Sequence, residues 1–337
     1  MIPALAVADA LRAEGAEVTF IGGERAEAQL VPGAGYPFKA IAVEGLSRTN
    51  RLHAARALAR AARATLHARA LLGELQADVV MGGGGYVAGP VGVAALTRRT
   101  PLVLTEADSH LGLTNRVLAR FARRVCLAFP IAGRDGPRYR VTGRPIPAVP
   151  VERAGARERL GIDAEERCVL VFGGSLGARS INYATLDALS SGTFRVIHVC
   201  GRRDYSELSK RSLREGYDLR EYMDIEQFTK ALAACDLVVA RAGGSVFEIA
   251  AQGVPAILVP YPHASADHQS TNARWMSEAG AANVIEDAQL SAASLGRAVA
   301  ELLADPHRLA RMAAASRALA RPQAAADIAA EILEACV

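Results

Sequence analysis

Residues 168–178 read CVLVFGGSLGA, and this stretch decides the fold. Its first five residues are apolar, as in a buried strand, and its glycines allow a tight turn into a following helix. A strand, a glycine turn and a helix in this order aim backbone N–H groups at an anion such as phosphate. The stretch lacks the GK[ST] sequence of the ATP-binding P-loop and fits the GxGxxG dinucleotide pattern poorly. It therefore predicts a phosphate-binding turn in an α/β domain, and it counts against an ATPase or a dehydrogenase.

Apolar runs that are typical of strands alternate with helical patterns along the chain. In the first half we expect strands at 17–21, 38–43, 78–81, 102–105 and 125–129. In the second half we expect them at 168–172, 195–200, 237–240, 256–259 and 282–285. Strands that alternate with helices predict parallel sheets flanked by helices.

A proline-rich stretch divides the two series of strands. Residues 143–150 read GRPIPAVP, and three prolines in so short a segment are typical of a linker. We therefore predict an α/β protein of two Rossmann-like domains facing a cleft, with an N-terminal domain at 1–146 and a C-terminal domain at 147–321. Residues 322–337 are expected to form a helix that packs back on the N-terminal domain. Ligands are expected where strand C-termini and helix N-termini converge.

The composition excludes several classes of protein. Of the 337 residues, 51% are apolar and 22% are charged, which excludes disorder, and no apolar run is long enough to cross a bilayer. The five cysteines lack metal-ligand spacing, so we expect reduced core residues and no metal site. Basic residues outnumber acidic ones 19 to 11 up to Pro150, and acidic residues outnumber basic ones 24 to 20 after it. The first half thus suits an anionic lipid or a pyrophosphate group, with a solvated basic face as the alternative, and no nucleic acid is expected.

Another glycine-rich turn lies in the first half, where residues 79–86 read VVMGGGGY. It joins a predicted strand to a helix that we expect to start near Pro90. The candidate ligand-binding residues of this turn are Gly83, Gly84, Gly85 and Tyr86. A tight turn that binds nothing is an equally good interpretation, but one glycine turn in each half suggests two phosphate-bearing ligands.

Two polar segments follow strands of the second half. In residues 241–248 (RAGGSVFE), Ser245 and Glu248 have the spacing of a capping box, which gives Glu248 a structural interpretation. The functional alternative is that the Glu248 carboxylate accepts hydrogen bonds from two ribose hydroxyls of a nucleotide. Residues 267–272 (DHQSTN) open a helix and indicate a rim that could bind a sugar, although any one of them would also serve as a cap.

Five segments resemble the MurG-type family of undecaprenyl-diphospho-muramoyl-pentapeptide N-acetylglucosaminyltransferases. They are residues 3–11 (PALAVADAL), 84–90 (GGYVAGP), 112–129 (GLTNRVLARFARRVCLAF), 173–182 (GGSLGARSIN) and 255–272 (PAILVPYPHASADHQSTN). The segments follow the order of the family, and the resemblance covers nearly the whole chain. It implies a GT-B glycosyltransferase in which the N-terminal half binds a lipid-linked muramoyl-pentapeptide (lipid I) and the C-terminal half binds UDP-GlcNAc. The implied product is lipid II, an intermediate of peptidoglycan synthesis.

The resemblance also implies roles for residues of the second half. Ser175 would contact the diphosphate, the backbone at Met223 would bind the uracil and Glu248 would bind the ribose. Gln269 would contact the GlcNAc. The implied UDP-GlcNAc site further includes Gly243, Gly244, Ser245 and Val246. The implied chemistry is inversion at the anomeric carbon by a muramoyl hydroxyl, without a metal or a cofactor, with helix N-termini stabilising the departing UDP.

The sequence departs from the family pattern at two segments of the site. The family's HEQN segment appears as TEAD at 105–108, so Asp108 replaces the asparagine that is expected to hold the sugar. The family's GNPVR linker appears as GRPIP at 143–147, which loses the terminal arginine. We expect Arg144 to replace it as a contact of the UDP-GlcNAc diphosphate.

A third departure concerns the general base. In the family a glycine loop ends in a histidine just before the proline that matches Pro3, and this loop is absent from the printed sequence. Among the residues present, Glu106 is the candidate for the base because it ends a predicted strand that faces the cleft. We further expect that the true N-terminus, with a first strand and a glycine loop, lies upstream of Met1.

Peripheral attachment to the cytoplasmic face of the cell membrane is expected through the first half. Residues 51–75 place Arg56, Arg60 and Arg63 at helical spacing among leucines, and Phe121 follows Arg120 in a second basic helix. The alternative is a pair of helices that pack their leucines into the core and leave the arginines in solvent.

Two other functions stay open on the sequence alone. Other GT-B proteins share the nucleotide-binding half, among them glycolipid synthases and UDP-GlcNAc 2-epimerases. The chain could also bind a UDP-sugar and catalyse nothing. The segments at 84–90 and 112–115 favour the cell-wall acceptor.

Overall fold

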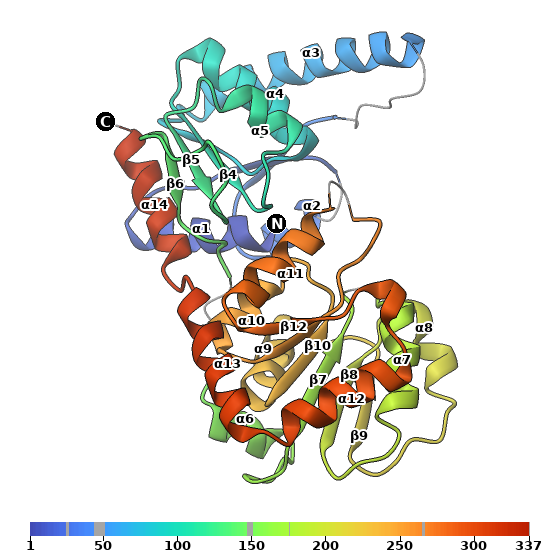
Figure 1. Ribbon diagram of the computed structural model, residues 1–337. Helices are drawn as coiled ribbons and strands as arrows, with labels where there is room; N and C mark the ends of the chain where they lie inside the picture. The colour runs from blue at the N-terminus through green and yellow to red at the C-terminus, as the bar shows by residue number, and fades with distance from the viewer. Residues whose placement is uncertain (25–26, 44–50, 147–150, 175, 265–266, 337) are drawn as a thin grey trace. The chain divides into compact units, whose positions relative to one another are not determined.

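The computed structural model describes residues 1–24, 27–43, 51–146, 151–174, 176–264 and 267–336, but not the side chains of 51–59. The chain divides into two compact units, each built of helices and strands (Figure 1). Unit 1 comprises Met1–Pro147 and Arg321–Val337, and unit 2 comprises Ala148–Ala320.

Unit 2 contains a parallel sheet of six strands in the order β12-β11-β10-β7-β8-β9. The strands are β7 (Cys168–Phe172), β8 (Arg195–Val199), β9 (Tyr217–Arg220), β10 (Leu237–Ala240), β11 (Ala256–Leu258) and β12 (Ala282–Val284). The helices of this unit are α6 (Arg153–Arg159), α7 (Arg179–Ala188), α8 (Arg202–Leu208), α9 (Ile225–Ala234), α10 (Val246–Gln252), α11 (His268–Glu278), α12 (Ala292–Leu303) and α13 (Pro306–Leu319). Every residue of the central strands β7 and β10 is buried, as expected where helices cover both faces of a parallel sheet. The strand order reverses between these two strands, and α/β sheets bind their ligands at such a point.

Unit 1 contains two parallel sheets among its described residues. One has the order β1-β2, with β1 at Phe20–Gly22 and β2 at Phe38–Ala40. The other has the order β3-β4-β5-β6, with strands at Val80–Gly82, Leu102–Glu106, Arg124–Leu127 and Tyr139–Val141. The helices are α1 (Ile2–Ala13), α2 (Glu27–Gly33), α3 (Arg51–Glu74), α4 (Gly85–Arg98), α5 (Leu113–Leu118) and α14 (Ala324–Ala335).

Side chains of strand β4 alternate between two cores of unit 1. Leu102 and Leu104 pack in one cluster with residues of α3, α4 and α5, whereas Val103 packs in another with residues of α1 and α14. This alternation follows from the two-residue period of a strand. Strand β4 is thereby fixed from both faces, and its carboxyl end at Glu106 has a defined position.

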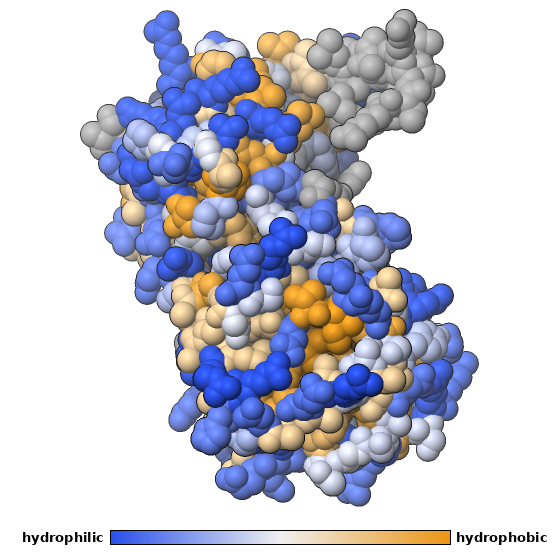
Figure 2. Space-filling view, viewed as in Figure 1, coloured by the Kyte–Doolittle hydropathy of each residue, from blue (hydrophilic) through white to orange (hydrophobic). Residues whose placement is uncertain are grey.

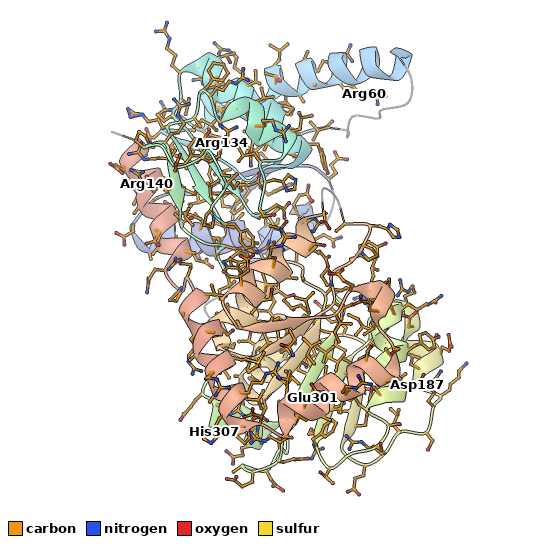
Figure 3. The ribbon with its side chains drawn as sticks, viewed as in Figure 1. Arg60, Arg134, Arg140, Asp187, Glu301 and His307 are labelled. Atoms are coloured by element: carbon orange, nitrogen blue, oxygen red, sulfur yellow. The ribbon has the colours of Figure 1, made fainter. Side chains whose placement is uncertain are left out.

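The C-terminal helix α14 is fastened to strands β5 and β6 by ion pairs. Glu331 accepts a hydrogen bond from Arg124 Nε at 2.6 Å and another from Arg140 Nε at 3.1 Å. Arg140 is labelled beside this helix in Figure 3. The Glu331 side chain is only 16% exposed, so the pairs are partly shielded from water.

Each of the ten strands predicted from the sequence overlaps a strand of the structure, which confirms them, although most are shorter than predicted. The sequence missed β6 and β9, which lie at the edges of their sheets and contain arginine or aspartate. The prediction for the start of α4 is wrong, because the helix begins at Gly85 and includes Pro90. The glycine turn thus leads into the helix without an intervening loop.

Four of the five cysteines are buried and all five are free thiols, as predicted, but Cys336 is exposed and is not a core residue. Burial raises the pKa of the Cys126 thiol to about 12, so this group stays protonated. In the described part of the chain, no helix combines the length and the apolar character that a membrane span requires.

Candidate active site

The loops that follow the parallel strands of unit 2 gather at one edge of its sheet (Figure 1). They include residues 173–174 and 176–178 after β7, Arg241 to Ser245 after β10 and residues 259–264 after β11. The sequence placed its predicted nucleotide-binding residues in these loops. Sheet topology therefore brings them to one edge, the carboxyl edge where α/β folds bind ligands.

The second glycine turn, residues 173–178, is closely packed against the end of β8. Gly177 has a φ of +78°, and a Cβ at this position would lie 1.8 Å from the carbonyl oxygen of Cys200. A Cβ at Gly173 would lie 2.4 Å from the backbone nitrogen of Ala178. Only glycine fits these positions, so the sequence of the turn is set by backbone contact. Ser175, the predicted diphosphate contact, lies outside the described residues.

Helix α7 begins directly after this turn. Ala178 occupies its N-cap position, and no side chain caps the helix. The N–H groups of an uncapped first turn are available to an anion, which the positive end of the helix dipole also favours. This geometry fits the predicted phosphate-binding role of the turn.

Arg241 connects three loops of this edge. Its guanidinium donates hydrogen bonds to the carbonyl oxygens of Val259 and Pro260, both at 3.1 Å, and to Asp287 Oδ1 at 2.6 Å. It also donates to Ser180 Oγ at 2.8 Å, in the first turn of α7. The Arg241 side chain is only 11% exposed. Sequence reasoning missed this role; an arginine directly after a buried apolar strand was the available signal.

The predicted capping box at α10 is wrong. Ser245 has helical dihedral angles (φ −63°, ψ −11°), and its side chain makes no capping hydrogen bond. Glu248 lies half-buried in the first turn of α10, near the positive end of the helix. Gly243 and Gly244 are half-buried in the preceding turn, and Val246 is fully buried. The Ser245 side chain therefore does not cap the helix, and the ribose-binding role of Glu248 stays a prediction.

Gln269, in the first turn of α11, and Met223, which follows β9, are two further predicted ligand contacts of unit 2. The side-chain oxygen of Gln269 accepts a hydrogen bond from the backbone N–H of Tyr261 at 3.0 Å, which fixes the amide in the first turn of α11. The Tyr261 ring lies in turn under the Arg241 guanidinium at 5.3 Å. Met223 follows strand β9, and it is 6% exposed. Their predicted contacts with the sugar and the uracil stay predictions.

Unit 1 has a wide, mostly apolar cavity of about 830 Å³ beside its own glycine turn. The predicted residues Gly83, Gly84, Gly85 and Tyr86 line it, together with residues of α4 and α5 such as Pro90, Val93, Leu113, Val117 and Leu118. Helix α4 begins at Gly85 without a side-chain cap, and Gly84 at its N-cap has a φ of +80°. Thr114 Oγ1 donates to the carbonyl oxygen of Gly85 at 3.0 Å and ties the turn to α5.

Glu106 ends strand β4 and also lines this cavity. Its carboxylate accepts hydrogen bonds from the backbone N–H of Gly112 at 2.8 Å, that of Asp108 at 3.2 Å and the side-chain amide of Asn115 at 3.0 Å. A carboxylate has about four acceptor positions, so about one is left to take a proton. Asn115 is 1% exposed, and it also donates to the carbonyl oxygen of Thr105 at 2.9 Å. The sequence did not anticipate this support by Asn115.

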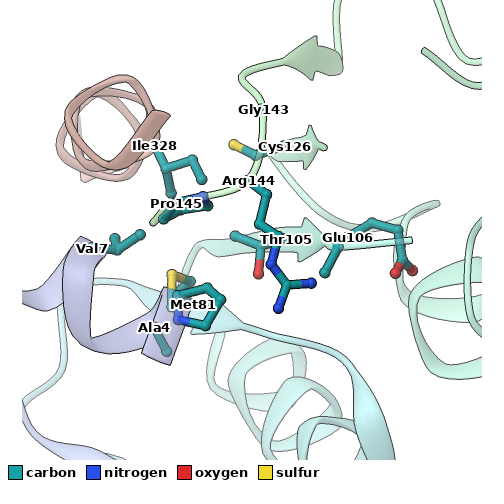
Figure 4. A pocket seen from close by; sticks show the side chains of 12 residues that line it. Ala4, Val7, Met81, Thr105, Glu106, Cys126, Gly143, Arg144, Pro145 and Ile328 are labelled. Carbon is teal, nitrogen blue, oxygen red and sulfur yellow. The ribbon is translucent and has the colours of Figure 1, made fainter. Parts of the chain in front are cut away.

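Arg144 lines a second, small cavity of about 30 Å³ in unit 1 (Figure 4). Thr105, Glu106 and Cys126 share this cavity with Pro3 of α1. Arg144 is thus placed near the carboxyl end of β4, as is the half-buried Asp108. The predicted contacts of Arg144 and Asp108 with the donor stay predictions.

Two units with parallel sheets and a glycine turn before a helix in each are typical of the GT-B fold. The sequence matches the model of the glycosyltransferase family 28 N-terminal domain over residues 1–127 and that of the C-terminal domain over residues 168–332. The chain belongs to glycosyltransferase family 28.

Relatives match this sequence along nearly its whole length. A protein of Rubrobacter xylanophilus is 41% identical over 337 residues, which cover 98% of both chains, and one of Moorella thermoacetica is 40% identical over 341 residues, covering 96% of this chain and 92% of the relative. Both are named UDP-N-acetylglucosamine–N-acetylmuramyl-(pentapeptide) pyrophosphoryl-undecaprenol N-acetylglucosamine transferase. The crystal structure of Acinetobacter baumannii MurG is similar at a TM-score of 0.80 and 29% identity, over 99% of this chain and 95% of that one. A UDP-N-acetylglucosamine 2-epimerase from Listeria monocytogenes, described as putative, matches at a TM-score of 0.62 and 16% identity over 92% of this chain and 94% of that one, which shows a common fold alone.

Proposed function

We propose that this enzyme transfers N-acetylglucosamine from UDP-GlcNAc to undecaprenyl-diphospho-MurNAc-pentapeptide, forming lipid II for peptidoglycan synthesis. The observation that carries the proposal is the 40–41% identity, over nearly the full length, to relatives whose names specify both substrates. The two glycine turns support it, because each substrate carries a diphosphate. Unit 2 is proposed to bind the donor and unit 1 the acceptor.

The loops at the carboxyl edge of unit 2 suit a nucleotide-sugar. The second glycine turn and the uncapped start of α7 offer backbone N–H groups to the diphosphate. We assign Glu248 to the ribose hydroxyls and Gln269 to the sugar, with Arg241 holding the surrounding loops. Residues Ser175, Met223, Gly243, Gly244, Ser245 and Val246 are assigned to the same ligand.

The cavity of unit 1 suits a lipid-linked acceptor. Its volume of about 830 Å³ exceeds what a phosphate needs, and its lining is mostly apolar, with polar groups at the glycine turn, in the Glu106 loop and at Thr65, Thr114 and Asn115. We assign the diphosphate of the acceptor to residues 83–86 at the start of α4. The rest of the cavity is then available to the sugar and the beginning of the lipid chain.

In the reaction, a muramoyl hydroxyl oxygen attacks the anomeric carbon of GlcNAc. The bond from that carbon to the UDP oxygen breaks with inversion, and the hydroxyl proton passes to a base. Glu106 is the proposed base, because about one acceptor position of its carboxylate is left after three internal hydrogen bonds. The start of α7 stabilises the negative charge that develops on UDP.

Peripheral membrane attachment through unit 1 forms part of the proposal. Leu113, Val117 and Phe121 are 65%, 55% and 63% exposed at a spacing of four residues, and arginines 116, 120 and 123 lie between and after them. Apolar and strongly polar residues alternate on the face of unit 1 seen in Figure 2. Such a surface binds an anionic bilayer by burying its apolar side chains and pairing its cations with lipid headgroups. Of the basic helix predicted at 51–75, Arg56 lies outside the described side chains, while Arg60 and Arg63 are exposed.

Flotation with anionic liposomes at low salt tests the attachment. Phe121→Ser is expected to reduce the floated fraction, whereas Val284→Ser, an exposed apolar residue of unit 2, leaves it unchanged. Equal flotation of both variants, or none of the wild type, would refute attachment through this surface.

Turnover with a soluble lipid I analogue tests the function itself. We expect release of UDP and formation of a disaccharide product from UDP-GlcNAc, without added metal. UDP release with a glycolipid acceptor alone, or conversion of UDP-GlcNAc to its 2-epimer, would point to another GT-B activity. Binding of UDP-GlcNAc with no turnover would leave a binding protein.

A further inference from the structure

A buried carboxylate in unit 2 joins two exposed arginines beside the second glycine turn. The side chain of Asp204 is 0% exposed, whereas those of Arg179 and Arg203 are 62% and 45% exposed. Arg179 approaches Asp204 Oδ1 with Nε at 3.2 Å and Nη2 at 3.0 Å. Arg203 donates from Nε to Oδ1 and from Nη2 to Oδ2, both at 3.0 Å. We call Arg179 and Arg203 the arginine pair.

A chain of buried side chains holds Asp204 from the interior. Asn182 Nδ2 donates to Asp204 Oδ2 at 2.9 Å and to the carbonyl oxygen of Cys200 at 2.9 Å. Its Oδ1 must then accept from His198 Nε2 at 3.1 Å, and His198 Nδ1 accepts from the Tyr217 hydroxyl at 2.8 Å. Burial lowers the pKa of His198 to about 3, so the ring is neutral and a single tautomer satisfies every bond.

The hydrogen bonds that Asp204 accepts from the arginine pair and from Asn182 keep its carboxylate ionised. The hydrogen bond from Arg203 is the main cause that lowers the pKa of Asp204 to about 2, with further lowering by Arg179 and Asn182, although burial acts in the opposite direction. The carboxylate is therefore charged at neutral pH. Its position is set by Asn182, and the two guanidinium groups take their positions from it.

The arginine pair lies at the second glycine turn. Arg179 is the first residue of α7, and helical side chains lean toward the helix N-terminus, which here is the turn. Arg203 is the second residue of α8, whose N-cap is Gly201. A Cβ at Gly201 would lie 2.2 Å from the backbone nitrogen of Gly177, so the two loops are in contact. The two arginines thus approach the same turn from two helices.

One carboxylate balances only one of the two cations. The pair keeps a net positive charge, its guanidinium groups remain half-exposed, and each has N–H donors beyond those that Asp204 accepts. Guanidinium groups bind phosphate oxygens through paired N–H donors. A diphosphate has more acceptor oxygens than the Asp204 carboxylate, so it can accept the remaining N–H donors of the arginine pair. An ion pair that only joined α7 to α8 would need one arginine.

We propose that Asp204 is a positioning residue that holds Arg179 and Arg203 for the diphosphate of the nucleotide-sugar donor. The inference rests on the proposed function in that it takes a nucleoside diphosphate as the ligand. It adds a contact from two arginine side chains to that of the glycine turn, and it assigns the buried Tyr217–His198–Asn182 chain the task of fixing the carboxylate. When UDP leaves, the same two cations stabilise its charge.

Calorimetric titration with UDP and with uridine, which lacks the phosphates, tests this proposal. Arg179→Ala is expected to weaken UDP binding by about 10- to 100-fold, because a charged hydrogen-bond pair to phosphate is lost. Uridine affinity should stay at the wild-type value. Asp204→Asn should also weaken UDP binding, and the triple variant Arg179→Ala/Arg203→Ala/Asp204→Asn should bind UDP no worse than Arg179→Ala/Arg203→Ala, because Asp204 acts through the two arginines.

Arg211→Ala is the matched control. Arg211 forms an ion pair at 3.3 Å with Asp187, which lies near the C-terminal end of α7 and therefore away from the glycine turn. Asp187 is labelled in Figure 3. The control should bind UDP like the wild type. Unchanged UDP affinity in Arg179→Ala and Arg203→Ala would overturn the proposal, as would an equal loss of UDP and uridine binding. A wild-type protein that binds no UDP would instead overturn the proposed function.

Discussion

The two glycine turns of this protein occupy equivalent places in their units but have opposite surroundings. In unit 1, a Cβ at Gly85 would meet nothing within 4 Å, and the turn opens on an apolar cavity of about 830 Å³. In unit 2, Gly173, Gly177 and Gly201 are packed backbone to backbone, and charged side chains surround the turn. The same strand-turn-helix device is open and apolar in one unit and closed and polar in the other.

The difference teaches how one local motif serves two ligands. Both turns present helix N–H groups to an anion, so neither turn alone selects its substrate. Selection comes from what each unit places around the turn: apolar side chains of α4 and α5 in unit 1, and Asp204 with its arginine pair in unit 2. Substitutions in the two units should therefore affect different steps.

Glu106→Gln should give the largest kinetic effect. If Glu106 takes the proton of the acceptor hydroxyl, kcat falls by about 100-fold or more, while the KM for UDP-GlcNAc stays close to the wild-type value because Glu106 is not among the residues assigned to the donor. Steady-state kinetics with a lipid I analogue checks this. A near wild-type kcat in this variant would show that Glu106 is not the base. Its role would then be structural, through its hydrogen bonds with Gly112, Asp108 and Asn115.

Gly177→Ala and Gly85→Ala compare the two turns directly. Both residues have positive φ angles, +78° and +75°, so alanine costs roughly 1–2 kcal/mol at either site. At Gly177 the Cβ would also lie 1.8 Å from the Cys200 carbonyl oxygen, which adds roughly 1–3 kcal/mol and displaces the turn.

Denaturant unfolding and UDP titration of both variants check this pair. Gly177→Ala should lose more unfolding free energy than Gly85→Ala, and it should also lose UDP affinity. If the two variants are equally stable and bind UDP equally well, the close packing of the second turn contributes neither to stability nor to UDP binding.

Acid should destabilise unit 2 through His198. Its pKa is lowered to about 3 in the folded state from the ordinary value of 6.5, so the unfolded chain binds more protons between these values. The contribution of the neutral His198 to the free energy of unfolding is fully present above pH 6.5. It falls as the pH drops toward 3, by roughly 2 kcal/mol between pH 6.5 and 4.5. His198→Gln can keep both neighbours hydrogen-bonded without titrating. Unfolding of both proteins as a function of pH should show a shallower acid slope for the variant, and identical slopes would contradict the assignment.

The smallest expected effect concerns the fastening of α14. Glu331→Gln removes the charge that pairs with Arg124 and Arg140, both partly exposed, and should lower the unfolding free energy by roughly 1–2 kcal/mol. Because none of these three residues is assigned to the donor site, UDP affinity should not change. A drop in UDP affinity would show that the two units do not act as separately as we infer.

The sequence predicts the framework of this fold well, because buried strands leave a strong signal. Strands β7 and β10 have the predicted bounds, since all of their residues are apolar and buried. Strand β9 was missed because an edge strand needs less apolar character, and YDLR shows little. Glycine turns are visible in the sequence because close backbone approach excludes other residues at Gly177.

The supporting contacts of the candidate site could not be predicted in this way. Arg179 and Asp204 are 25 residues apart in sequence, and Arg241 and Ser180 are 61 apart. Their pairing depends on which strands are neighbours in the sheet, and the spacing of residues does not contain that information. The capping box at Ser245 failed for a related reason, because the backbone there is already helical and the side chain is not placed to cap.

The central claim is that unit 2 binds the donor and unit 1 the acceptor. Backbone hydrogen–deuterium exchange, measured with each substrate separately, is its most direct test. UDP-GlcNAc should slow exchange at the carboxyl edge of unit 2, in residues 176–182, 241–248 and 267–272, and leave residues 83–93 of unit 1 unchanged. A lipid I analogue should slow exchange at residues 83–93 and 106–118 of unit 1. Protection of residues 83–93 by UDP-GlcNAc, or of residues 176–182 by the lipid I analogue, would contradict the account.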